Sequence, residues 1–163
     1  MALTDSQLTQ VYLVDTTTTL TAVSDIETAI ASATKLTCFQ SFGDLVETRA
    51  AQEYKCIDSN GSQKSMGSVS LGNVAVEFLF DAADITGQSV LRTMFDGNTR
   101  KRMIVQLNDE PTTGASPHPT YIDVEIANAS SGITIALDAA VVYKTSIELC
   151  SRMVWNNAAE TTV

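Results

Sequence analysis

Four carboxylates at alternating positions of apolar segments are the residues best suited to chemistry. They are Glu77, Asp123, Glu125 and Glu148. Two carboxylates held close together can act as a general acid and a general base. Alternation with apolar residues is also the ordinary pattern of a strand that has one face in solvent. We therefore interpret these positions as one polar face of a sheet and not as a catalytic pair.

The sequence offers no suitable general base for a nucleophilic side chain. The only histidine, His118, lies between Pro117 and Pro119, where we expect an exposed loop. A serine or cysteine nucleophile needs a base within hydrogen-bond reach. The sequence has no GxSxG motif, and neither a Walker A loop nor GxGxxG follows a predicted strand. We predict that the protein is not an enzyme and has no nucleotide site.

The cysteines and the one calcium-like segment do not indicate a metal site. Cys38, Cys56 and Cys150 are odd in number, far apart and in no CxxC pair, so we expect buried thiols. Asp58-Ser59-Asn60-Gly61 begins like a calcium loop, but the position of the EF-hand glutamate is Gly67. Its Asn-Gly pair favours a tight hairpin turn instead. We predict no metal and no cofactor.

Length and charge limit the possible partners. The 163 residues correspond to about one domain, and 10 basic against 19 acidic residues give a net charge of −9. Surfaces that grip nucleic acid need Lys and Arg, so this acidic balance argues against a surface that binds nucleic acid tightly. An acidic channel would instead repel DNA and let it slide. No apolar stretch approaches the ~20 residues of a membrane span, and the start lacks the pattern of a signal peptide.

Period-two alternation predicts a mainly β protein. The stronger predicted strands are Asn73 to Phe80, Arg102 to Leu107, Tyr121 to Ala127 and Thr145 to Met153. The weaker candidates are Gln10 to Val14, Lys35 to Phe39, Glu53 to Asp58 and Ile133 to Leu137.

One segment, Asp84 to Asp96, has helical spacing instead. Its apolar stripe predicts that Leu91, Met94 and Phe95 pack onto the sheet. Asp84 and Thr86 are candidate N-caps, and the Gly-Asn pair at positions 97 and 98 can end a helix in the left-handed conformation. The expected fold class is therefore mainly β, a β-sandwich or half-barrel with one flanking α-helix.

Other segments are less regular. A second, weaker helix is predicted from Ser24 to Ser32, with Ser24 as its cap and Glu27 at the capping-box position. Phe42 to Gly67 is polar and long for a connection, which is typical of a functional loop. We expect a single domain, residues 1–163, with mobile termini at 1–9 and 156–163.

The middle of the chain resembles a known family. The runs that carry the resemblance are Gly61-Ser62-Gln63-Lys64-Ser65-Met66-Gly67, Asn73 to Phe80, Gly87-Gln88-Ser89-Val90-Leu91 and Phe95-Asp96-Gly97-Asn98-Thr99-Arg100. In order and spacing, over about Leu45 to Leu107, they are similar to the tail tube (major tail) proteins of siphophages. The resemblance implies a tail-tube-like, ring-forming subunit whose hexameric rings stack into a tube around a channel for viral DNA.

The resemblance also implies partners and a location. The partners would be other copies of the chain, other tail proteins at the two tube ends, the tape measure protein and then DNA in the lumen, without sequence-specific binding. The location would be the virion, as part of the phage tail, with assembly in the host cytoplasm. Each subunit would close the sheet edge of its neighbour.

Site residues follow from this hypothesis. Phe42 to Gly67 would be the assembly loop between rings, ordering against an adjacent ring through Thr48, Arg49, Gln52, Lys55, Asp58, Asn60 and Lys64. The candidates for the lumen are Glu77, Asp123, Glu125 and Glu148, with an outer solvated face as the alternative. Arg100, Lys101 and Arg102 directly follow the predicted helix, where positive charge interacts favourably with the carbonyl end of the helix dipole. They are also possible subunit contacts.

Two alternatives remain open from the sequence. A tail terminator, another virion ring protein, or the tube of a contractile system would share the ring fold. A monomeric β-sandwich binding module would need exposed aromatic residues, for which Tyr54, Tyr121 and Trp155 are the candidates.

Overall fold

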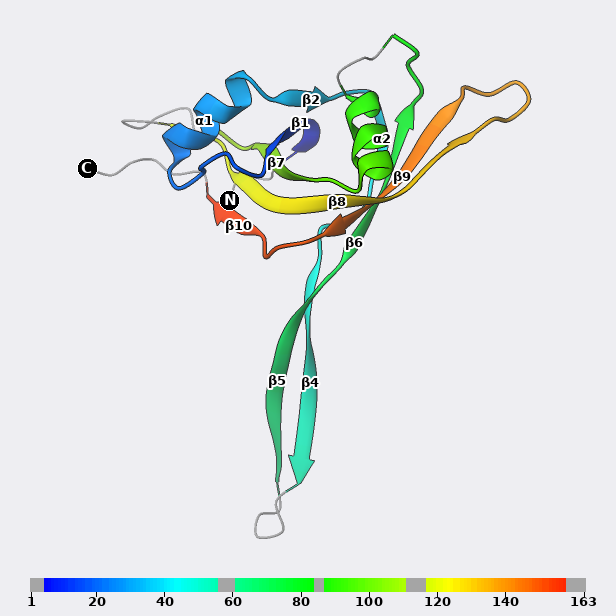
Figure 1. The fold of residues 1–163 in the computed structure, drawn as a ribbon. Coiled ribbons are helices and arrows are strands. Elements are labelled where there is room, and N and C mark those ends of the chain that lie inside the picture. The colour runs from blue at the N-terminus through cyan, green and yellow to red at the C-terminus, as the bar shows by residue number, and fades with distance from the viewer. Residues whose placement is uncertain (1–4, 56–60, 84–86, 111–116, 158–163) are drawn as a thin grey trace.

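A computed structural model describes residues 5–55, 61–83, 87–110 and 117–157 (Figure 1). Within these ranges the elements follow in the order β1 (Asp5–Asp15), α1 (Val23–Ala31), β2 (Thr34–Leu36), β3 (Phe39–Phe42), β4 (Glu47–Lys55), β5 (Ser62–Leu71), β6 (Asn73–Leu79), α2 (Gln88–Gly97), β7 (Arg100–Asn108), β8 (Tyr121–Thr134), β9 (Val142–Leu149) and β10 (Val154–Asn156). The prediction of a mainly β protein is confirmed.

Eight of the strands form one open antiparallel sheet, in the order β2-β1-β7-β8-β9-β6-β3 with β10 beside β8. β8 pairs with β7 over its first half and with β9 over its second half, while β10 pairs with its first three residues. The expected sandwich layers are thus parts of one continuous sheet. β4 and β5 form a separate two-stranded hairpin that extends away from this sheet (Figure 1).

The main core lies on the face of the sheet that α2 covers. Leu91 and Met94 of α2 are buried there against strand residues such as Val124 and Ile126, as the helical spacing predicted. Phe95 was expected beside them, but its side chain is 43% exposed, so this part of the prediction is wrong. Phe95 lies in the last turn, where left-handed Asn98 ends the helix and the chain turns toward β7.

A smaller core lies on the opposite face, under α1. Ile26 and Ala29 pack against Tyr12, Ile104 and Tyr121. The sheet therefore carries two helices, one on each face, where the expected fold class had one flanking helix. This explains why the first residues of β8 are buried on both faces.

The N-terminus of α1 differs from the expected cap. The helix begins at Val23, so Ser24 lies inside it. The cap is made by Asp25, whose carboxylate accepts hydrogen bonds from the Ala22 backbone N–H at 3.0 Å and from the Thr21 hydroxyl at 2.8 Å. These bonds, chiefly the one from Thr21, lower the pKa of Asp25.

The segment from Phe42 to Gly67 is not a loop. Most of it forms β4 and β5, which pair from Glu47 with Leu71 to Lys55 with Ser62. The hairpin carries no apolar alternation because neither of its faces is buried. Hydrophobic periodicity cannot detect such strands.

Three smaller expectations also change. Lys35 to Phe39 is divided into β2 and β3 by Cys38, which has a positive φ of 62°. Cys38 is exposed and Cys150 half-buried, so the prediction of buried thiols is wrong for Cys38. The predicted strand Ile133 to Leu137 only overlaps the end of β8.

The expected mobile N-terminus, residues 1–9, overlaps β1, which begins at Asp5. At the other end of the chain Asn156 belongs to β10, and residues 158–163 lie outside the described ranges. The predicted caps of α2, Asp84 and Thr86, and one cysteine, Cys56, also lie outside them.

Across the described ranges, neither helix has the length and apolar character needed to cross a membrane.

The orientation of α2 predicts unequal effects of two substitutions. Leu91→Ala should lower the free energy of unfolding by about 2–5 kcal/mol, because it opens a cavity in a buried site. Phe95→Ala should cost about 1 kcal/mol or less, since its side chain is half in solvent. Urea denaturation followed by circular dichroism measures both, and a larger cost for Phe95→Ala would contradict the observed orientation.

Candidate functional site

The uncovered part of one sheet face is polar, and it contains the acidic residues singled out in the sequence. Directly opposed residues on antiparallel strands point to the same face. Glu125 opposes Arg102, Glu148 opposes Ala127, and Glu77 opposes Lys144. We call this surface the polar face and define it by Glu77, Arg100, Glu125, Lys144 and Glu148.

Most of the acidic groups on this face are ion-paired. Glu77 forms an ion pair with Lys144 at 2.9 Å, and Glu125 accepts a hydrogen bond from Arg100 at 3.3 Å. Glu148 has no cationic partner within 4.0 Å among the described residues. The polar face of the chain is therefore close to neutral, and Glu148 is its least compensated carboxylate.

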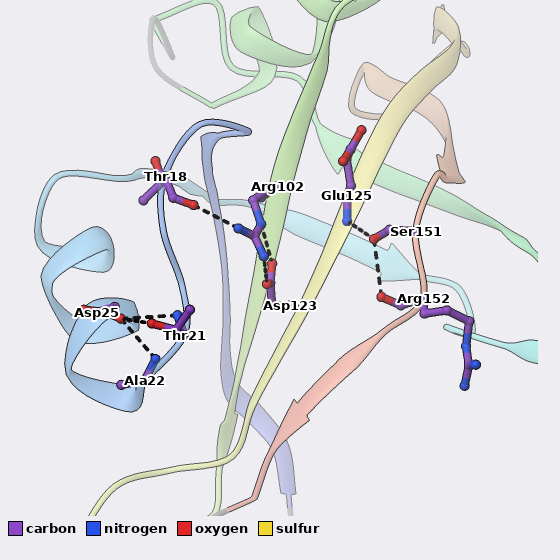
Figure 2. A network of polar contacts seen from close by, with 9 residues as sticks. All are labelled: Thr18, Thr21, Ala22, Asp25, Arg102, Asp123, Glu125, Ser151 and Arg152. Carbon is purple, nitrogen blue, oxygen red and sulfur yellow. Dashed lines mark hydrogen bonds and ion pairs between the residues drawn. The ribbon is translucent and has the colours of Figure 1, made fainter.

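Asp123 lies on the same side of the sheet but is not part of the polar face. It is only 2% exposed, because α1 and the neighbouring strands cover the start of β8. Figure 2 shows that the Arg102 guanidinium pairs with the carboxylate of Asp123 and also donates to the Thr18 carbonyl oxygen at 2.8 Å. Asp123 cannot face a channel as expected, and its ion pair holds the connection between β1 and α1 against the sheet.

Burial and pairing act on Asp123 in opposite directions. Removal from water raises the pKa of its carboxyl group, while the hydrogen bond and charge of Arg102 lower it. Burial is the larger effect, so the pKa stays above its usual value. Asp123 thus depends on Arg102 for its ionised state.

The three cations after α2 are all used inside the chain. Besides the pairs of Arg100 and Arg102, Lys101 donates to Asp15 at 2.7 Å across the β1–β7 pair. Arg100 keeps 61% of its side chain exposed, so it is the one of the three most open to a neighbouring subunit. A role of these residues in subunit contacts remains a proposal.

The hairpin displays the residues predicted for assembly. Thr48, Arg49, Gln52, Lys55 and Lys64 are all exposed on β4 or β5. Asp58 and Asn60 lie outside the described residues. The strands have 9 and 10 residues, which gives a ribbon roughly 30 Å long at about 3.3 Å per residue.

The root of the hairpin is tied firmly to the sheet. The Glu47 carboxylate accepts from the Met153 backbone N–H at 2.6 Å and from Arg152 at 3.0 Å. The bond from Met153 is the main reason that the pKa of Glu47 is lowered. A Cβ added at Gly72 would lie 2.9 Å from the Val46 carbonyl oxygen, so this close approach requires glycine. The hairpin therefore leaves the body in a fixed direction.

The segment that anchors Glu47 also joins β9 to β10. The Cys150 N–H donates to the Glu125 carbonyl at 2.7 Å, and the Glu125 N–H donates to the Ser151 hydroxyl at 2.9 Å (Figure 2). Sequence reasoning missed Glu47 and Arg152 because the partners are 105 positions apart. No local pattern in the sequence marks them.

The longest free strand edges belong to the hairpin. The strands at the two ends of the main sheet, β2 and β3, have only 3 and 4 residues, and short edge strands limit pairing with other chains. A two-stranded ribbon exposed on both faces is only marginally stable alone. This geometry favours the hairpin over the main sheet edges as an element that needs a partner.

The remaining candidates from the sequence are the metal ligands, His118 and the aromatic residues. No group of three or more His, Cys, Asp or Glu side chains in the described ranges could hold a metal ion. His118 stacks on Tyr121 with ring centroids 6.3 Å apart, and burial raises the pKa of Tyr121 to about 12. Of the aromatic residues considered for a binding module, Tyr54 lies on β4, Trp155 on β10 and Tyr121 in the core. They do not share one surface.

No protein-family model and no curated protein matches the sequence. Solved structures do match the fold. The SPP1 tail tube has a TM-score of 0.67 at 14% identity, over 98% of this chain and 82% of that chain. The sheath/tube terminator of PVC, an extracellular contractile injection system, has a TM-score of 0.67 at 12% identity. The match covers 96% of this chain and 98% of that chain. The tail of the empty GTA particle, refined helically with C6 symmetry, has a TM-score of 0.60 at 10% identity. The match covers 90% of this chain and 95% of that chain.

Identities this low show a shared fold. The expectation of a tail-tube-like fold is confirmed.

The ion pair of Asp123 predicts that the stability lost on substituting Arg102 depends on pH. Arg102→Gln leaves a buried carboxylate without its cation and should cost about 3–5 kcal/mol at neutral pH. A carboxyl group whose pKa is raised by folding stabilises the protein at low pH, and this stabilisation is lost as the pH rises through the folded pKa. Without Arg102 the pKa rises further, so the stability gap to the wild type should be smaller at pH 5 than at pH 8.

Denaturation at several pH values measures this gap. Arg100→Gln is the matched control, because its pair with Glu125 is exposed and should contribute about 0–1 kcal/mol. A gap for Arg102→Gln that does not change with pH would contradict the account of Asp123.

Proposed function

We propose that the chain is the structural subunit of a bacteriophage tail tube, which assembles as stacked hexameric rings around a channel for viral DNA. The observation that carries the proposal is the similarity to the SPP1 tail tube over 98% of the chain. The C6 symmetry of the similar GTA tail supports six subunits per ring. The function would be mechanical, and we propose no enzymatic activity.

The hairpin is the proposed contact between rings. It extends away from the body (Figure 1), and the outer edges of both its strands are free of other strands in the described chain. Its fixed root at Glu47 and Gly72 would direct the same strands of every subunit toward the next ring. Pairing or packing there would stabilise a ribbon that is marginal by itself.

The polar face is the proposed lining of the channel. Its residues are exposed or half-buried, whereas the opposite face of the same strands forms the core. Paired charges present no excess of cations that would hold phosphates. DNA and the tape measure protein would therefore pass without sequence-specific binding.

The remaining partners and the location follow from this function. Other tail proteins would bind the two ends of the tube, and the assembled tube would be part of the virion after assembly in the host cytoplasm.

A tube terminator is the second candidate. The PVC terminator matches the fold with the same TM-score as the SPP1 tail tube and is covered more completely. A terminator forms one ring at a tube end, whereas a tube subunit forms a polymer of many rings. Electron microscopy of the purified protein separates the two: stacked rings support the tube, and single rings support the terminator.

Shortening the hairpin tests the contact between rings. Arg49 and Val69 are a cross-strand pair, so residues 50–68 can be replaced by an Asn-Gly turn that joins the shortened strands. The variant should fold but form single rings or free subunits in place of tubes, as measured by negative-stain microscopy and sedimentation. Full-length tubes from this variant would contradict the proposed contact.

Charge reversal tests the channel lining. Glu77→Lys combined with Glu148→Lys should leave tubes intact but make them retain short DNA, because added cations bind phosphates in a salt-dependent way. DNA retention after nuclease treatment is the measurement. Asp96→Lys on α2, which covers the opposite face of the sheet, is the control for added charge away from the polar face. Equal retention in both variants would argue against a polar face that lines the channel.

A further inference from the structure

The connection between β8 and β9 carries an exposed apolar tip, which we define as Ile133 to Val141. Leu137 is 94% exposed and Ile135 is 73% exposed. Asp138 is the one charged residue in this stretch. Contiguous apolar side chains in solvent are uncommon on a soluble subunit and mark a contact surface.

An apolar pocket lies elsewhere on the same chain. It has a volume of about 540 Å³ and is lined mainly by apolar side chains of β1, β3, β7 and β8, among them Val11, Phe42, Leu107 and Ile122. Leu45, on the way to the hairpin, completes one side. The pocket thus opens from the main core beside the root of β4 and has room for several aliphatic side chains.

The tip and the pocket cannot meet within one subunit. Ile122 of the pocket and Ile133 of the tip both belong to β8, which runs continuously between them. The eleven positions that separate them correspond to roughly 35 Å at about 3.3 Å per residue. Two surfaces at opposite ends of a strand can touch only if they come from two copies of the chain.

Charge does not supply the attraction between the two surfaces. Lys144, which opposes Gly132 at the base of the tip, is already paired with Glu77 at 2.9 Å. Asp138 on the tip and Asp44 at the pocket are both exposed and acidic. The contact would therefore depend on the apolar side chains of the tip and the pocket.

We propose that the apolar tip of one subunit inserts into the pocket of its neighbour in the same ring. This inference rests on the proposed function, which requires a contact between neighbours. A head-to-tail contact of this kind generates rings when its rotation closes. β8 runs across the direction of the hairpin (Figure 1), so a contact along β8 lies in the ring when the hairpin points to the next ring.

Cross-linking tests the contact directly. Leu137→Cys and Leu45→Cys are introduced together into a chain whose natural cysteines are changed by Cys38→Ser, Cys56→Ser and Cys150→Ser. Treatment of assembled rings with a short bismaleimide should give a ladder of covalent oligomers that ends at the closed ring, while each single-cysteine chain gives dimers at most. Rings that are visible by microscopy but yield no ladder would overturn the inference and leave the proposed function intact.

A charge substitution gives a second, independent test. Leu137→Asp should leave the subunit folded and raise the concentration needed for ring formation by at least about tenfold, since it places a charge in an apolar pocket. Met66→Asp is the control, because Met66 is also an exposed apolar residue, 58% exposed, but lies on the hairpin, and it should still form single rings. Rings formed normally by Leu137→Asp, or lost equally in both variants, would overturn the contact.

The behaviour of the wild-type chain tests the proposed tube function separately from the proposed contact between neighbours. If it forms no rings under any condition, the proposed function fails, and the inference fails with it.

Discussion

The backbone pairing of β8 is the interaction on which the rest of the structure depends. This one strand of 14 residues pairs with β7, β9 and β10 and thereby holds the two halves of the sheet together. Because side chains alternate along it, one face of β8 builds the main core and the other carries Asp123 and Glu125. Its length also separates the apolar tip from the pocket, so the same hydrogen bonds determine both the interior of the chain and the positions of the two surfaces proposed to meet between copies.

A subunit built in this way leaves several surfaces incomplete. The hairpin has free edges and no buried face, and the apolar tip lies in solvent. Each of these features would be unfavourable in a monomer and becomes favourable when another copy covers it. The charged residues differ from these surfaces, because Arg100, Arg102 and Lys144 already form ion pairs within the chain. Assembly can therefore rest on strand edges and apolar contacts, with ion pairs fixing the shape of each subunit.

The sequence predicted the elements whose two faces differ. β6, β7 and β8 were recognised because apolar residues alternate with polar ones, and Leu91 and Met94 were placed correctly by helical spacing. It failed where tertiary contacts decide the outcome. Asp123 follows the pattern of a solvent-facing residue, yet α1, distant in sequence, buries it. β4 and β5 show no periodicity because nothing covers either face. The turn predicted at Asn60–Gly61 lies partly outside the described residues. The link from Glu47 to Met153 spans over a hundred positions and has no local signature.

We propose that the exposed edges and apolar surfaces of this fold are covered only in a stacked ring. Cryo-electron microscopy of the purified full-length chain would show this. We expect a hollow tube of repeating six-subunit rings, with the polar face toward the lumen and β4–β5 of each subunit touching the next ring. Solid fibres with the polar face outward, or monomers at every concentration tested, would contradict it.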